Sequence, residues 1–415
     1  MRNSILAVVS VLTATLSAGA ANNRFGTPSE LSASQVLETF RDNGDLRSQR
    51  RHIWTVFAEL TRTMDGQDRP VFESWYGEDQ VFASGSIERA PNGIRSFSRS
   101  DRQGAAHVGG VPILTYTLYN DAAYRHVRAN GLNRSSELER LRATGTVDRA
   151  ITGNRSIPPF PRQAMVLKTV WWPVAQDAIT ALPVWDPELN PVRPSGNGYT
   201  SWQRAVAINP LGHAADGSTH DIAFAGRTFS KVRQFDLAAF HHIVLDARLA
   251  ERLMRDRESR STAFIALGRT LKAGDSLVLV GANLATKELS DWIWAAFWWH
   301  DLPDQGPFAA DRPERASSKW SSYLMQVAFD SSTPTEPDGG AHICFNPWLE
   351  GRFPDGGGGG GTSSNCLACH RRASYPAANF LPITRGGREL THDPAYAAGQ
   401  LRTSFLWSIA MHAGP

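Results

Sequence analysis

Cysteine and lysine are both scarce in this sequence. Three cysteines among 415 residues are too few for a disulfide-rich scaffold. Only 5 of the 43 basic residues are lysine, and 40 acidic residues nearly balance them. The net charge of +3, with scattered arginines, builds no strong field of one sign, so we expect no nucleic-acid partner. A Gly-rich phosphate-binding fingerprint between a strand and a helix is also missing.

Long apolar runs are missing too. Near the start, Arg2 precedes an apolar stretch from Ile5 to Leu16 and the small residues Ala18 to Ala20. This order is typical of a signal peptide, which we place at residues 1–20. The stretch is too short to cross a bilayer, and no later run reaches about 18 residues. We therefore expect an exported, periplasmic protein without a transmembrane segment after signal cleavage.

The remaining chain predicts a mixture of strands and helices. Short apolar segments rich in β-branched or aromatic residues predict strands at Met165–Val174, Ser276–Val280, Trp292–His300 and Tyr323–Phe329. The third of these is apolar on both faces, so we expect it to be central. Helical spacing or capping residues predict helices at Ser34–Phe40, Arg50–Thr61, Ser136 to just before Gly145, and Asp236–Asp256.

The most informative residues are Cys366, Cys369 and His370, which form a C-x-x-C-H motif. This is the pattern of covalent c-type haem attachment. The two thiols add to the haem vinyl groups, and the adjacent imidazole becomes the proximal iron ligand. We expect one covalently bound haem c, held by these three residues.

Two other functions of the motif fit the sequence less well. A thioredoxin-like dithiol needs a strand before the first cysteine, but Gly356–Gly361 and a polar stretch precede this one. A zinc site needs four ligands, and a second C-x-x-C or an H-x-x-x-H is absent from the sequence. Cys344 is left without a role and is predicted to be a small buried hydrophobe.

The position of the motif predicts the organisation of the chain. Only 45 residues follow His370, so the haem is expected to pack against a larger body. We predict an α+β fold: a mixed, loop-rich, β-containing body with peripheral helices over residues 21–355, and a Gly-rich loop with a haem c-binding C-terminal segment over residues 356–415. A boundary between two subdomains of the body is predicted near residues 150–160.

The sixth iron ligand decides what such a centre can do. A strong ligand makes an electron carrier, whereas an open position admits peroxide, oxygen or small gases. His300 is the distal candidate, because it shares a predicted strand face with three tryptophans. Other residues with a candidate role are the possible ligands His241, His242, His342, His392, Met411 and His412, the possible propionate partners Arg371 and Arg372, and the partly buried Lys168.

Several segments resemble a group of exported bacterial proteins of the cytochrome c family. The segments that carry the resemblance are Thr55–Ala58, Trp75-Tyr76, Leu167-Lys168, Trp171–Pro173, Leu279–Gly281, Thr286–Glu288, Trp292–Trp294, Phe297–His300, Cys344–Glu350, Ser364–Arg372 and Phe405–Ser408. Proteins of this group often have a His after the segment corresponding to Val280-Gly281, where this sequence has Asn283.

The motif, the signal sequence and the resemblance together predict a function. We expect a periplasmic monohaem c-type cytochrome that exchanges electrons with a redox partner protein or a small-molecule donor or acceptor. A haem-dependent peroxidase or oxygenase is the alternative enzyme class. A haem-based binding or sensor protein is a further alternative.

Overall fold

The computed structural model describes most of the chain. The described ranges are 28–64, 69–85, 111–147, 154–189, 198–212, 217–313, 319–331, 334–335, 342–352, 364–377 and 399–414. The predicted signal peptide and the run Gly356–Gly361 lie outside these residues, as do residues 148–153 at the predicted boundary. None of the described helices is both long enough and apolar enough to cross a membrane.

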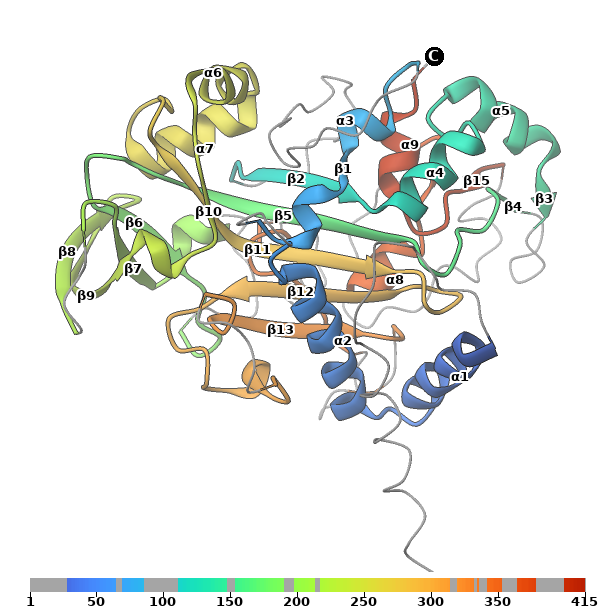
Figure 1. Cartoon of the computed structure of the whole chain (residues 1–415), viewed down its shortest axis with the longest axis horizontal. Coiled ribbons are helices and arrows are strands. Elements are labelled where there is room, and N and C mark those ends of the chain that lie inside the picture. Colours follow the sequence, from blue (N-terminus) through green and yellow to red (C-terminus); the bar gives the residue numbers. More distant parts are fainter. Residues whose placement is uncertain are drawn as a thin grey trace, which may run out of the picture.

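A seven-stranded sheet forms the centre of the molecule (Figure 1). Its strands pair in the order β1-β2-β5-β11-β12-β13, β10 also pairs with β11, and all pairs are antiparallel. The bounds are β1 Tyr76–Gly77, β2 Leu114–Tyr119, β5 Met165–Val174, β10 His242–Val244, β11 Ser276–Thr286, β12 Ile293–Trp299 and β13 Tyr323–Ala328.

Two four-stranded sheets flank the central sheet. The first has the order β6-β7-β9-β8, with β6 Thr180–Val184, β7 Arg204–Asn209, β8 Thr219–Phe224 and β9 Arg227–Asp236. The second has the order β14-β15-β4-β3, with β3 Thr146–Val147, β4 Arg155–Ser156, β14 Ser374–Tyr375 and β15 Leu401–Arg402. The second sheet therefore joins the segment after the C-x-x-C-H motif to residues far earlier in the chain.

Helices surround the sheets (Figure 1). The α-helices are α1 Pro28–Asp42, α2 Leu46–Thr61, α3 Glu78–Val81, α4 Asp121–Ala129, α5 Ser135–Thr144, α6 Ala247–Arg255, α7 Arg257–Leu267, α8 Cys366–His370 and α9 Trp407–His412. Short 3₁₀ turns are η1 Val71–Ser74, η3 Gly198–Ser201, η4 Leu237–Ala239 and η5 Pro307–Ala309. The predicted mixed α+β fold with peripheral helices is confirmed.

Both faces of the central sheet are buried. On one face α2 crosses the strands, and Phe57 stacks on Phe297 with 4.2 Å between ring centroids. On the opposite face Val166, Ala285 and Trp294 lie side by side in register. This row belongs to a hydrophobic cluster that includes residues of α8 and α9, namely Cys366, Leu367 and Ile409. Because both faces of the sheet are buried, the side chains of β12 are apolar on both faces of the strand.

Most predicted elements are present, but the helix predicted from Asp236 begins eleven residues before the observed helix α6. β9 ends at Asp236, and His242–Val244 forms β10 on the edge of β11. The helix α6 starts only after Asp246, whose side chain accepts a hydrogen bond from the Leu249 amide at 2.7 Å. The apolar spacing predicts a helix for this segment, but the backbone groups of His242–Val244 form their hydrogen bonds with β11 instead.

Helix α5 ends at Gly145 as predicted, although its start differs. It begins at Ser135, and the preceding Arg134 makes no side-chain cap. The Ser135 amide donates instead to the carbonyl of Gly414. The sequence predicts a capping side chain at the start of this helix, at Ser136, but a backbone carbonyl from the end of the described chain accepts the hydrogen bond instead.

Candidate functional site

The C-x-x-C-H motif forms one short helix, α8. In a helix, residues three and four positions apart lie on the same side, so both cysteines and the histidine share one flank. Asn365 caps this helix, because its side-chain oxygen accepts from the Ala368 amide at 3.1 Å. Its side-chain amide also donates to the carbonyls of Asp330 and His342 at 3.2 and 3.0 Å. One buried residue therefore fixes both the start and the position of α8.

Backbone pairing with the segment around Cys344 holds the motif against the body. The Cys344 amide donates to the Ser364 carbonyl at 2.9 Å, and the Cys366 amide donates to the Cys344 carbonyl at 2.9 Å. These two bonds form a parallel bridge between Cys344 and Asn365. The chain between the two segments is long, so the bridge brings together residues that sequence analysis could not pair.

His370 is oriented by a backbone carbonyl. Its Nδ1 lies 2.8 Å from the Phe405 oxygen. A carbonyl oxygen only accepts, so Nδ1 carries the proton and Nε2 keeps its lone pair. Burial lowers the pKa of His370 to about 4, and the Lys168 charge adds to this effect while the Phe405 carbonyl opposes it. A neutral imidazole whose second nitrogen is hydrogen-bonded is the form that ligates a metal.

The turn that supplies this carbonyl has an unusual backbone. Ser404 and Phe405 have φ angles of 48° and 68°, and Trp292 has a φ of 64°. Non-glycine residues rarely adopt this left-handed region, and three of them meet here. Trp292 Nε1 donates to the Ser404 hydroxyl at 3.3 Å, which ties the start of β12 to the turn. Such strained residues cluster at functional sites.

The aromatic ring of Trp294 covers one side of His370. The ring centroids are 3.9 Å apart with an interplanar angle of 31°. The indole nitrogen of Trp294 is buried and has no hydrogen-bond partner among the residues that the structure describes. A buried N–H group without a partner is a donor available to a carboxylate of a bound group.

No disulfide joins the three cysteines in the structure. The Cys366 thiol is buried, donates to the Cys344 carbonyl at 3.1 Å and lies 4.0 Å from the Cys344 sulfur. Cys369 is half-buried, and burial raises its pKa to about 12. The contact with Cys344, together with burial, raises the pKa of Cys366 well above its ordinary value. Cys344 itself is fully buried, as predicted.

A polar group lies on the sheet face beneath the motif. Asn283 on β11 pairs in register with Lys168 on β5, and its amide donates to a Glu350 oxygen at 3.1 Å. Asn346 donates to the Asn283 oxygen at 3.0 Å and, through its backbone amide, to Glu350. Burial raises the pKa of Glu350 to about 7, although Lys168 and the hydrogen bonds oppose the shift. Glu350 in turn raises the pKa values of both motif cysteines.

Gly281 allows this polar group to pack against the sheet. A Cβ atom at Gly281 would lie 3.3 Å from the side-chain atoms of Asn346, closer than most Cβ contacts. Asn346 is fully buried and also donates to the Phe297 carbonyl at 3.0 Å. The glycine thus permits the segment that carries Cys344 and Glu350 to lie directly on β11.

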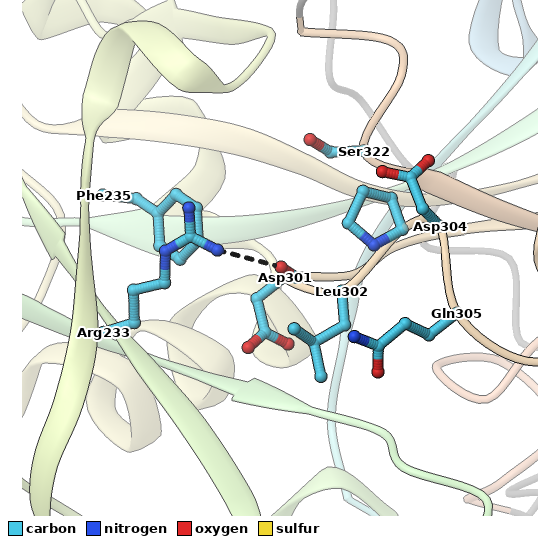
Figure 2. Close-up of a pocket in the computed structure, with 8 residues that line it drawn as sticks. Arg233, Phe235, Asp301, Leu302, Asp304, Gln305 and Ser322 are labelled. Carbon is cyan, nitrogen blue, oxygen red and sulfur yellow. Dashed lines mark hydrogen bonds between the residues drawn. The ribbon is translucent and has the colours of Figure 1, made fainter. Parts of the chain in front are cut away.

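His300 lies at the other end of β12. Six residues of extended strand separate it from Trp294, or roughly 20 Å at about 3.3 Å per residue. Its Nδ1 accepts a hydrogen bond from the Leu302 amide at 3.0 Å. The next two residues, Asp301 and Leu302, line a pocket of about 320 Å³. Figure 2 shows this pocket, where Arg233 donates to the Asp301 carbonyl at 3.2 Å. The structure therefore does not bring the distal candidate to His370.

The other candidate residues of the described chain have partners of their own. His241 pairs with the buried Glu73 at 2.7 Å, and His342 lies 2.7 Å from the Val327 carbonyl. Further contacts are His242 with the Phe240 carbonyl at 3.1 Å, His412 with Glu78 at 3.3 Å, and Arg371 with Asp291 at 2.7 Å. Arg372 is buried, Met411 lies in α9, and His392 is outside the described residues.

Three functional features were not predicted from the sequence. The hydrogen bond to His370 comes from the backbone carbonyl of Phe405, which no residue type in the sequence indicates. The contact of Trp294 with His370 and the proximity of Glu350 to the cysteines join residues far apart in the sequence, so no local sequence pattern predicts them. Phe405, Trp294 and Glu350 all lie in segments that carry the family resemblance. That resemblance was the one signal that pointed to them.

The residues at the site fit a covalently bound haem. Two thiols and an imidazole share one helical turn, the imidazole is neutral and oriented, and a buried N–H group is available to a carboxylate. Comparison with protein-family models, with curated proteins and with solved structures finds no match for this chain.

Proposed function

We propose that this protein is a periplasmic monohaem c-type cytochrome that transfers electrons to or from a redox partner protein or a small molecule. Cys366 and Cys369 would hold the haem through thioether bonds, and His370 would be its proximal ligand. The bound haem would supply one-electron oxidation and reduction of its iron.

The orientation of His370 is the observation that carries this proposal. The Phe405 carbonyl oxygen accepts a hydrogen bond from Nδ1, with 2.8 Å between the two atoms. The imidazole therefore keeps the lone pair of Nε2 available to a metal. Trp294 packs against the ring and limits its rotation. Hydrogen bonds to a ligating histidine increase its basicity and set the properties of the metal.

Covalent haem can be tested in a host that attaches c-type haem. The purified protein should show the pyridine haemochrome spectrum of haem c and keep its colour in acid acetone. The double variant C366S/C369S should lose all covalent haem, because no thiol remains to form a thioether at the motif. A wild-type protein without covalent haem, or a double variant that retains it, would contradict the proposal.

A second candidate is a haem-dependent oxidoreductase, and Glu350 favours it. A carboxyl group with a pKa of about 7 near the attachment cysteines can give and take protons at neutral pH. The spectrum of the reduced protein before and after addition of CO separates the two candidates. An unchanged Soret band favours electron transfer, whereas a shifted band means that the iron is accessible and favours the enzyme.

A further inference from the structure

Cys344 lies beside the first cysteine of the haem motif without belonging to the motif. The Cys344 and Cys366 sulfur atoms are 4.0 Å apart, and both side chains are buried. Neither the proposed electron transfer nor the proposed haem attachment uses Cys344. Its sulfur is nevertheless within side-chain reach of one of the two thiols that must react with haem.

The backbone geometry suits a bond between these two sulfurs. The two chain segments are joined by hydrogen bonds of 2.9 Å on either side of Cys344. The residue paired with Cys344 is Asn365, and Cys366 follows it directly. The Cα atoms of Cys344 and Cys366 therefore lie diagonally across the pairing, roughly 6 Å apart, which is within the range that disulfides span. A disulfide needs a sulfur–sulfur distance of about 2.05 Å, so the side chains must close a gap of about 2 Å by rotation.

We propose that Cys344 and Cys366 form a disulfide in the haem-free protein, which withholds Cys366 from haem attachment until the bond is reduced. The two thiols lose two protons and two electrons to a disulfide oxidant, which is released as two thiols. Cys369 stays a free thiol. This inference rests on the proposed function for its consequence, but the disulfide itself forms without haem.

The contact between the two cysteines also bears on when this disulfide can form. Only a thiolate attacks a disulfide efficiently, and burial with the Cys344 contact keeps the folded Cys366 protonated. The bond therefore forms while the two segments are still docking, when both thiols are accessible.

A peptide map of the haem-free protein tests the disulfide. The protein is exported in a host without c-haem maturation, its free thiols are alkylated, and it is digested with trypsin without reduction. Cys344 falls in residues 320–352, and both motif cysteines fall in residues 353–371. We expect these two peptides to be linked, with one alkylated cysteine. Three alkylated cysteines, or a bond within residues 353–371 alone, would overturn the proposal.

Single variants assign the bonded sulfur. C369S should keep the link, whereas C366S and C344S should lose it. Loss of the link in C369S with its retention in C366S would assign the bond to Cys369 and overturn the inference.

Haem attachment is measured separately by pyridine haemochrome. In a maturation host without added reductant, C344S should carry at least twofold more covalent haem per chain than the wild type, and a reductant should remove this difference. Equal loading without reductant would overturn the proposed control of attachment. Absence of covalent haem from both proteins would contradict the proposed function, whereas the peptide map would still decide whether the disulfide exists.

Discussion

At the scale of single residues, Glu350 is a buried carboxyl group close to the motif cysteines. Its carboxyl group accepts from Asn283 at 3.1 Å and from the Asn346 amide, and Lys168 supplies a positive charge. Burial nevertheless dominates and raises its pKa from 4.5 to about 7. The ionised form is therefore disfavoured in the folded state.

This shift predicts how stability depends on pH. Because the folded pKa lies above the unfolded one, the stabilisation is complete below about pH 4.5 and is lost as the pH rises through about 7. The loss is on the order of 3 kcal/mol at most. Glu350→Gln cannot ionise, so its free energy of unfolding should fall less between pH 5 and pH 8.

Urea unfolding at several pH values measures this effect. Glu251→Gln on α6 is a matched control, because Glu251 is exposed and, within the described residues, pairs with Arg255 on the same helix. The control should show the wild-type dependence on pH. Identical pH slopes for the wild type and Glu350→Gln would refute the assigned role of Glu350.

At the scale of elements, α8 is too short to be stable alone. Helices of so few residues depend on tertiary contacts, and the Asn365 side chain makes three hydrogen bonds at the start of α8. Asn365→Ala should lower the free energy of unfolding of the haem-free protein by roughly 2–3 kcal/mol, because a cap is lost and the carbonyls of Asp330 and His342 lose a donor.

Asn365→Ser separates the cap from the other two bonds. Serine restores a capping oxygen and should recover about 1 kcal/mol relative to alanine. Chemical denaturation of the three proteins gives these values, and covalent haem per chain should follow the same order. Equal stability of the alanine variant and the wild type would show that the helix does not depend on Asn365.

The elements also show what sequence patterns can and cannot predict. The predicted strands Met165–Val174 and Tyr323–Phe329 are mostly apolar, and burial on both faces makes such runs recognisable. The segment after Asp236 has helical spacing, yet it pairs with β11, because pairing with a distant strand overrides local spacing. The motif residues were predictable from their spacing, whereas the Phe405 carbonyl and Glu350 depend on tertiary contacts.

At the scale of the whole molecule, the small sheet β14-β15-β4-β3 connects distant parts of the chain around the motif. Leu401 pairs with Arg155 on one side and Tyr375 on the other, and its side chain is fully buried. The turn that holds Phe405 follows directly, and the Thr403 amide donates to the Ala373 carbonyl at 3.0 Å. The sheet therefore positions the acceptor of His370.

Leu401→Ala should weaken both the fold and the site. Removal of a buried leucine side chain costs about 2–5 kcal/mol, and the variant should also bind less haem because the turn is less firmly held. Val147→Ala on β3 is the control, since Val147 is exposed and its change should stay within about 0.5 kcal/mol. Thermal unfolding and haem content measure the two effects, and equal values for both variants would argue against this role.

The contact between Trp294 and His370 also has a photophysical consequence. The indole ring centroid lies 3.9 Å from that of the imidazole that we propose as iron ligand, so a bound porphyrin, which absorbs strongly, would be next to Trp294. Excitation energy would pass from the indole to the porphyrin, so emission from Trp294 would be quenched in every molecule that carries haem. Intrinsic fluorescence would then report, without any label, how many chains have been loaded.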